Sequence, residues 1–272
     1  MRIKLSLRVN TPATVIPYNY QHYLSSALYG ILSRSSGVYS EFLHQKGYLG
    51  PDGRLRKLFT FSKLFFNRRI SKNRFGYKCE QGCEIWMFVS SPMLHDFVRH
   101  FVTGLFEDQI IRIDKVLLNV YQVESMADPD FSEEMKFICL SPVVLKSVVL
   151  TSTGKKTYYY RPLDENLSQA VRASAINKYR TVHNKNPDSD ELEFIVDKNY
   201  IKRRGGQEHV AKLVTVKKGT KEETKIKGFE VPFTLKGSVE LIKNIYDCGI
   251  GDQCSLGFGC VNVVENSNKR GG

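Results

Sequence analysis

Apolar and polar residues alternate with a period of two at the start of the chain, which predicts a first β-strand over residues 2–9. After Pro17, apolar residues recur at helical spacing and predict an amphipathic helix over residues 18–35. Residues 38–57 hold three glycines and one proline, so we expect this segment to be partly loop. Apolar runs predict the other elements of this half: strands at residues 58–66, 84–90 and 115–123, and a helix at residues 91–106.

The second half of the chain repeats this order of elements. The pattern predicts a strand at residues 135–140 that continues into 143–150, a helix at 163–183, strands at 191–197 and 225–235, a helix at 237–249 and a closing strand at 254–265. The order strand–helix–strand–strand–helix–strand is typical of the ferredoxin-like split βαβ fold. The predicted fold class is therefore α+β, with tandem ferredoxin-like (RRM-like) βαββαβ domains over residues 1–125 and 126–272.

The charge of the chain points to a polyanionic partner. The 272 residues have a formal net charge of +12 and a pI of about 9.3. Such a balance favours nucleic acid first and an anionic membrane surface second. No apolar run approaches the roughly 20 residues that span a bilayer, so we expect no membrane segment.

The six cysteines are scattered along a chain without the apolar core of a secretion signal. We therefore expect reduced thiols and a cytoplasmic protein. Cys79 and Cys83 have the spacing C-x3-C, with His95 and His100 downstream. No second close pair of Cys or His residues completes a tetrahedral zinc site, so small buried side chains are the favoured interpretation and no metal is expected.

Positive charge collects in residues 54–78, which contain nine Lys or Arg residues and no Asp or Glu. Phenylalanine and tyrosine residues interleave with these cations, and aromatic faces stack on unpaired bases while cations neutralise phosphates. A merely solvated face usually mixes both signs of charge. The candidate RNA-binding residues of this segment are Arg54, Arg56, Lys63, Arg68 and Arg69.

A second basic cluster, Lys202, Arg203 and Arg204, precedes a Gly-Gly pair, and five further lysines follow between residues 217 and 227. We interpret this region as a mobile basic hairpin between two strands that clamps RNA. A solvated loop is the equally weighted alternative.

The segment GIGDQCSLGFG, residues 249–259, holds four glycines between the last helix and the last strand. Glycines let backbone N–H groups approach phosphates. The Walker loop is excluded because no Lys-Ser or Lys-Thr follows, and the dinucleotide fingerprint is excluded because the order runs from helix to strand. The candidate RNA-binding residues here are Gly249, Gly251, Ser255, Gly257 and Gly259.

This glycine pattern resembles the C-terminal motif of the RAMP superfamily of CRISPR-associated proteins. Within it, the chain is similar to the family-six endoribonucleases, which cut the repeat RNA of CRISPR precursor transcripts. The similarity extends to PYNYQHYLSSALYGIL (17–32), FLHQKGY (42–48), KLFTFSKL (57–64) and SLGFG (255–259). The resemblance implies paired ferredoxin-like domains, CRISPR repeat RNA as the partner, and an association with an effector ribonucleoprotein complex.

Metal-free cleavage of RNA uses the 2′-hydroxyl as nucleophile and needs a base, an acid and a cation near the phosphorane. Tyr29, His44 and Lys57 supply those groups, and the resemblance assigns the family's catalytic triad to the same three residues. The residues alone leave open whether Tyr29 or His44 is the base. Lys46, Arg56 and Lys63 are alternatives to Lys57. No cofactor is expected, and both a monomer and a homodimer are compatible with the sequence.

The leading prediction is therefore a metal-independent endoribonuclease that matures CRISPR guide RNA. It would leave a 2′,3′-cyclic phosphate and a 5′-hydroxyl. The alternative is a non-catalytic repeat-binding subunit on the same scaffold, because a fold does not dictate a function.

Overall fold

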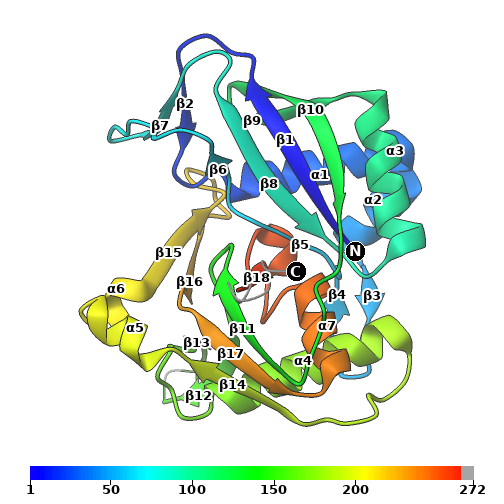
Figure 1. Ribbon diagram of the computed structural model, residues 1–272, viewed down its shortest axis with the longest axis vertical. Helices are drawn as coiled ribbons and strands as arrows, with labels where there is room; N and C mark the ends of the chain where they lie inside the picture. Colours follow the sequence, from blue (N-terminus) through cyan, green and yellow to red (C-terminus); the bar gives the residue numbers. More distant parts are fainter. Residues whose placement is uncertain (153, 265–272) are drawn as a thin grey trace, which may run out of the picture.

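The computed structural model describes residues 1–152 and 154–264. Two β-sheets lie one above the other in Figure 1. We call the part from β1 to β10 the N-terminal unit and the part from β11 to β18 the C-terminal unit. Among the helices formed by the described residues, none is long and apolar enough to cross a lipid bilayer.

The N-terminal unit contains three α-helices and a sheet in the order β5-β8-β1-β10-β9, with β6 also paired to β8. Its elements are β1 (Arg2–Val9), β2 (Thr14–Pro17), α1 (Gln21–Ser35), α2 (Gly37–Gln45), β3 (Tyr48–Leu49), β4 (Leu55–Arg56), β5 (Thr60–Phe61), β6 (Phe65–Phe66), β7 (Gly76–Cys79), β8 (Glu84–Ser90), the π-helical turn η1 (Leu94–Val98), α3 (Arg99–Glu107), β9 (Ile110–Ile113) and β10 (Val116–Met126).

The alternation in β1 has the predicted consequence. Ile3, Leu5, Leu7 and Val9 are each at most 2% exposed. They pack in one core with the apolar stripe of α1, which includes Leu24 and Leu28. Successive side chains of a strand point to opposite faces, so this pattern places α1 on one face of the sheet.

The C-terminal unit contains a second sheet in the order β14-β17-β11-β18. Its elements are β11 (Glu134–Cys139), β12 (Lys146–Thr151), β13 (Gly154–Tyr159), α4 (Leu167–His183), β14 (Leu192–Val196), α5 (Lys198–Arg203), α6 (Gln207–Val210), β15 (Ala211–Val216), β16 (Thr224–Phe229), β17 (Phe233–Gly237), α7 (Val239–Cys248), the short 3-10 turn η2 (Cys254–Leu256) and β18 (Val261–Val263).

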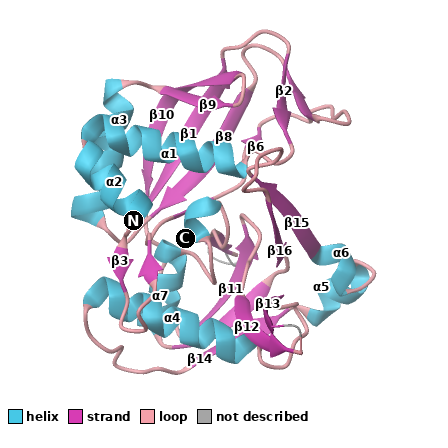
Figure 2. Cartoon of the chain, turned by 180° about the vertical axis from the view of Figure 1, so that it is seen from behind, coloured by secondary structure: helices cyan, strands magenta, loops and turns pink. Residues whose placement is uncertain are grey.

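Both sheets follow the ferredoxin-like order, in which the second, third, first and fourth strands of the βαββαβ unit lie side by side. In Figure 2, α1 and α3 lie over the first sheet and α4 and α7 over the second. The predicted α+β class with two ferredoxin-like units is confirmed. The boundary after residue 125 stays a prediction.

Several predicted elements were wrong in detail. Residues 143–150 do not extend the first strand of the C-terminal unit, because β11 ends at Cys139 and, among the described residues, β12 pairs with β13 in a separate two-stranded sheet. The predicted strand over 225–235 is two strands, β16 and β17, separated at Pro232. The predicted strand over 58–66 is also divided, into β5 and β6. The end of the closing strand, residue 265, lies outside the described residues.

The predicted basic hairpin is also revised. Lys202 and Arg203 lie on helix α5, whose N-cap Asp197 accepts a hydrogen bond from the Tyr200 N–H at 2.7 Å. The hairpin of this region is instead formed by β15 and β16, which follow α5 and α6. An N-cap aspartate satisfies the free amide groups of the first turn and so favours a helix over an extended loop.

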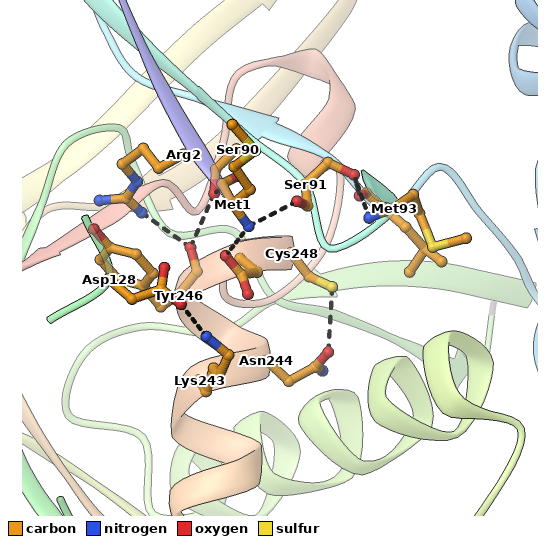
Figure 3. Close-up of polar contacts among 12 residues, drawn as sticks. Met1, Arg2, Ser90, Ser91, Met93, Asp128, Lys243, Asn244, Tyr246 and Cys248 are labelled. Carbon is orange, nitrogen blue, oxygen red and sulfur yellow. Dashed lines mark hydrogen bonds and ion pairs between the residues drawn. The ribbon is translucent and has the colours of Figure 1, made fainter. Parts of the chain in front are cut away.

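The two units meet through buried polar contacts (Figure 3). Arg2 is 1% exposed, and its guanidinium donates to the Tyr246 carbonyl at 2.9 Å and to Asn262 Oδ1 at 3.1 Å. The same guanidinium lies 3.6 Å from the centre of the Tyr246 ring. A buried cation with several partners of this kind tolerates little displacement. The units are therefore held in a defined relative position.

Candidate active site

Helices α1 and α2 form a tight helical pair that brings Tyr29 and His44 together. Their ring centroids lie 5.2 Å apart, with the rings nearly perpendicular at 83°. Ser40 Oγ of α2 donates to the Tyr29 carbonyl at 3.0 Å, which attaches α2 to α1. Residues 38–57 were expected to be partly loop, and residues 37–45 form α2. They are helical because Ser36 caps the helix by accepting from the Tyr39 N–H at 3.2 Å.

Lys57 reaches the same place after the chain turns back through the β3–β4 hairpin. Its Nζ donates to the His44 carbonyl at 2.8 Å. Gly47 makes this return possible: its φ is +74°, and a Cβ there would lie 2.5 Å from the Arg56 carbonyl oxygen. Burial lowers the pKa of Lys57. The structure therefore brings the three predicted catalytic residues into one site.

The glycine loop, residues 249–259, adds a fourth polar side chain to this site from the C-terminal unit. The Ser255 side chain lies near enough to the Tyr29 phenol to affect the pKa of that phenol. Burial raises the pKa of Tyr29 to about 12, and Ser255 acts in the opposite direction. Ser25 Oγ donates to the Ser255 carbonyl at 2.8 Å, which holds the loop against α1.

Close packing explains most of the glycines in this loop. A Cβ on Gly257 would lie 2.6 Å from the Phe61 ring, and one on Gly259 would lie 2.0 Å from the Ile250 carbonyl oxygen. The N–H groups of Gly249, Gly257 and Gly259 donate within the protein, to Ile245, Cys254 and Pro142. These three amides therefore already have acceptors within the protein, and a contact between these glycines and RNA stays a prediction.

A cleft of about 660 Å³ lies between the units, and Lys57 is one of the residues that line it. It is lined by the β4 region, by α4 and by the glycine loop, including Gly251 and Ser255. Its basic side chains are Arg54, Arg56, Lys57, Lys146 and Lys178. Sequence reasoning missed Lys146 and Lys178. The signal for Lys178 was available, because it falls on the same helical face as the buried Val171 and Ala175.

Comparison with known proteins identifies the family. The family model described as "CRISPR associated protein Cas6, C-terminal" matches residues 126–263, and "CRISPR-associated protein Cas6, N-terminal" matches residues 15–124. The chain belongs to the Cas6 family. A relative from Methanocaldococcus jannaschii, named "CRISPR-associated endoribonuclease Cas6 1", is 31% identical over 270 residues, covering 99% of this chain and 95% of the relative.

Two further Cas6 relatives agree with this assignment. A Pyrococcus furiosus protein named "CRISPR-associated endoribonuclease Cas6" is 24% identical over 256 residues, covering 94% of this chain and 86% of that protein. A solved structure titled "CRISPR associated protein Cas6" has a TM-score of 0.74 at 29% identity, and the match covers 97% of this chain and 99% of that one. The similarity therefore extends across both units.

Two of the three alternatives to Lys57 in this Cas6 chain, Arg56 and Lys63, are engaged elsewhere. Arg56 binds both carboxylate oxygens of Asp52, each at 2.7 Å, and this pairing lowers the pKa of Asp52 to about 2. Lys63 Nζ lies 2.8 Å from Glu230 Oε1, in an ion pair that joins the two units. Lys46, the third alternative, is the C-cap residue of α2, and its side chain is exposed.

The other predicted RNA-binding residues lie away from the cleft. Arg68 and Arg69 line a separate cavity of about 780 Å³ beside the β2–β7 pair. Lys202, Arg203 and Arg204 are exposed on and after α5, which Figure 1 places on the side of the molecule away from β3 and β4. The predicted binding residues are therefore divided among three surfaces.

The candidate zinc ligands do not gather into a metal site. Burial raises the pKa of Cys79 to about 12, and the neighbouring Cys83 acts in the same direction. His100 Nδ1 lies 2.9 Å from Ser35 Oγ, and its ring stacks on Tyr39. Within residues 1–152 and 154–264, no three His, Cys, Asp or Glu side chains are grouped as metal ligands.

Proposed function

We propose that this Cas6 protein is an endoribonuclease that cleaves CRISPR repeat RNA in precursor transcripts to release mature guide RNAs, without a metal ion. The observation that carries the proposal is the meeting of Tyr29, His44 and Lys57 at one site. The names of the relatives, which are CRISPR-associated endoribonucleases, support the same activity.

His44 is the proposed general base. Its side chain is exposed at the end of α2, where a ribose has access to it. Histidine exchanges protons near neutral pH more readily than any other side chain. His44 takes the proton of the 2′-hydroxyl, and the 2′-oxygen attacks the adjacent phosphorus. The P–O5′ bond then breaks, leaving a 2′,3′-cyclic phosphate on one product.

Tyr29 is the proposed general acid. With a pKa raised to about 12, the phenol keeps its proton at neutral pH and is a poor base. It donates that proton to the departing 5′-oxygen, which becomes a 5′-hydroxyl. Lys57 supplies positive charge beside the phosphorane, since its ammonium is held next to His44.

The RNA is proposed to extend from this site over the basic surfaces. Arg54, Arg56, Gly251 and Ser255 line the same cleft as Lys57 and are proposed to bind the nucleotides next to the cut. Lys63, Arg68, Arg69 and the cluster Lys202, Arg203 and Arg204 bind more distant phosphates. The mature RNA then remains bound and joins a larger effector ribonucleoprotein.

A cleavage assay with labelled CRISPR repeat RNA from the source genome tests the proposal. We expect cleavage in EDTA, no cleavage of RNA with a 2′-deoxy group at the cut site, and a cyclic phosphate on the upstream product. Loss of activity in EDTA that Mg²⁺ restores contradicts the metal-free mechanism. Tight binding without cleavage supports instead a non-catalytic repeat-binding subunit.

A further inference from the structure

Lys178 is a buried cation at the base of the cleft between the units. It is 8% exposed, and its Nζ donates to the Gly249 carbonyl at 2.7 Å and lies 3.1 Å from the Cys254 sulfur. Among the described residues, no carboxylate forms an ion pair with it. A buried ammonium without a counter-charge is costly, which indicates that an anion completes the site.

The rest of the cleft has the same surplus of positive charge. Five basic side chains and two carboxylates line it. Asp52 is bound to Arg56, and Asp252 accepts from the Lys146 backbone N–H at 2.9 Å. Both carboxylates therefore have partners already. The Lys146 side chain is exposed and is available to the same anion.

Gln253 is an independent observation in this cleft. Its φ of +56° is in the left-handed region, which residues other than glycine seldom adopt. Its Oε1 is buried and has no hydrogen-bond partner among the described residues. Backbone strain and an unsatisfied buried polar group are both features that concentrate at binding sites. The amide needs a donor from a ligand, such as a hydroxyl.

We propose that this cleft is a ribonucleotide subsite next to the cut, in which Lys178 and Lys146 bind a backbone phosphate and Gln253 accepts a hydrogen bond from a ribose hydroxyl. The inference deepens the proposed function and rests on it. A phosphate alone satisfies the two lysines and leaves the amide of Gln253 without a partner. A nucleotide with a ribose satisfies all three groups.

Binding rather than cleavage tests the phosphate contacts. The probe is the CRISPR repeat RNA with a single 2′-deoxy group at the cut site, so that it is bound and not cut. We expect Lys178→Met to raise the Kd about tenfold and to reduce the slope of log K against log salt by about 0.7, the value for one phosphate contact on a single strand. We expect Lys146→Gln, a change at an exposed position, also to raise the Kd and to reduce the salt slope. This second variant keeps the test valid if Lys178→Met does not fold.

Lys236→Met is the matched control, because Lys236 is exposed and pairs with Glu134 on the far side of the C-terminal sheet. If Lys178→Met and Lys146→Gln both bind with the affinity and salt slope of Lys236→Met, the phosphate site is wrong. If wild type binds normally but never cuts, the proposed function fails while this subsite stands.

Gln253→Gly tests the ribose contact, because glycine accepts the left-handed backbone and removes only the amide. We expect wild type to prefer the probe over an all-deoxy strand of the same sequence, and Gln253→Gly to reduce that preference about fivefold or more. An unchanged preference overturns the ribose contact. Inorganic phosphate and the RNA probe are also compared as competitors at equal phosphate concentration. If inorganic phosphate competes as effectively as the RNA, the cleft is a simple anion site, and the proposed ribonucleotide subsite is wrong.

Discussion

The two units share one topology but extend different connections. In the N-terminal unit the first helix and second strand are joined by residues 36–59, which form α2 and the β3–β4 hairpin. In the C-terminal unit the same connection is the short segment 184–191. In the C-terminal unit the longest connections are those between β11 and α4 and between β14 and β17, and the glycine loop is the connection after its second helix.

These two extensions meet at the cleft between the units, which Arg54 and Lys57 of the first extension line together with Gly251 and Ser255 of the glycine loop. The glycine loop also packs on the elements beside the first extension, because Thr60 Oγ1 of β5 donates to the Phe258 carbonyl at 2.9 Å. The sheets supply the frame, and the candidate chemistry lies in the connections, which is where scaffolds commonly place function. The comparison therefore predicts that changes in the first extension remove chemistry, whereas changes in the second disturb its position.

The largest expected effect is that of His44→Ala in the first extension. Removing a general base lowers the rate by about 100- to 10,000-fold. We expect the Kd for RNA with the 2′-deoxy cut site to change by less than about threefold, because the side chain makes no phosphate contact in the proposed mechanism. Single-turnover cleavage and filter binding measure the two quantities.

His95→Ala is the control for that measurement, since His95 is an exposed histidine outside the site. It should retain the wild-type rate. If His44→Ala cuts RNA as fast as His95→Ala, the hypothesis that the first extension holds the general base is wrong.

Gly259→Ala should be the most destabilising change in the second extension. The φ of +69° and the approach of 2.0 Å to the Ile250 carbonyl oxygen leave no room for a Cβ. We expect the free energy of unfolding to fall by about 3 kcal/mol, measured by urea titration. Gly30→Ala is the matched control, because Gly30 lies in α1 with nothing within 4 Å of its Cβ position. It should stabilise the protein by about 0.5–1 kcal/mol, and equal losses in the two variants would contradict the packing role.

Ser255→Ala should have an intermediate effect on rate. The phenol of Tyr29 loses the neighbouring hydroxyl that lowers its pKa, so it becomes a weaker acid. We expect the single-turnover rate to fall about tenfold, equivalent to about 1.4 kcal/mol. Ser255→Thr keeps the hydroxyl and should restore most of the rate. In a Tyr29→Phe background, Ser255→Ala should cause little further loss of rate. If the two changes lower the rate independently, Ser255 does not act through Tyr29.

The smallest expected effect concerns Asp52 in the β3–β4 hairpin. Arg56 holds the pKa of this carboxyl at about 2, below its unfolded value of 3.8. The pair therefore stabilises the fold above pH 3.8, and this contribution disappears as the pH falls toward 2. Because the pair is near the surface, we expect less than about 1 kcal/mol. Urea titrations of wild type and Asp52→Asn should differ at pH 6 and converge near pH 2, and a constant difference would contradict the role of the charge.

Periodic patterns in the sequence were sufficient to predict the frame of the molecule. The alternation in residues 2–9 predicted β1 because every second side chain must enter the core. The helical spacing after Pro17 predicted α1 for the same reason. The resemblance of four short motifs predicted the family and the residues Tyr29, His44 and Lys57.

Tertiary structure alone decided how those residues are used. The helix α2 is too short for a clear period and depends on the cap by Ser36 and on the bond from Ser40 to α1. The glycines of the loop were predicted to face phosphate, yet Gly257 packs against Phe61 and Gly259 against Ile250. Phe61 is far away in the sequence, and nothing in the sequence around Ile250 marks it as a neighbour of Gly259. Contacts between residues far apart in the chain leave no local pattern, so the pairing of Ser255 with Tyr29 and the burial of Lys178 emerge only when the two units are packed together.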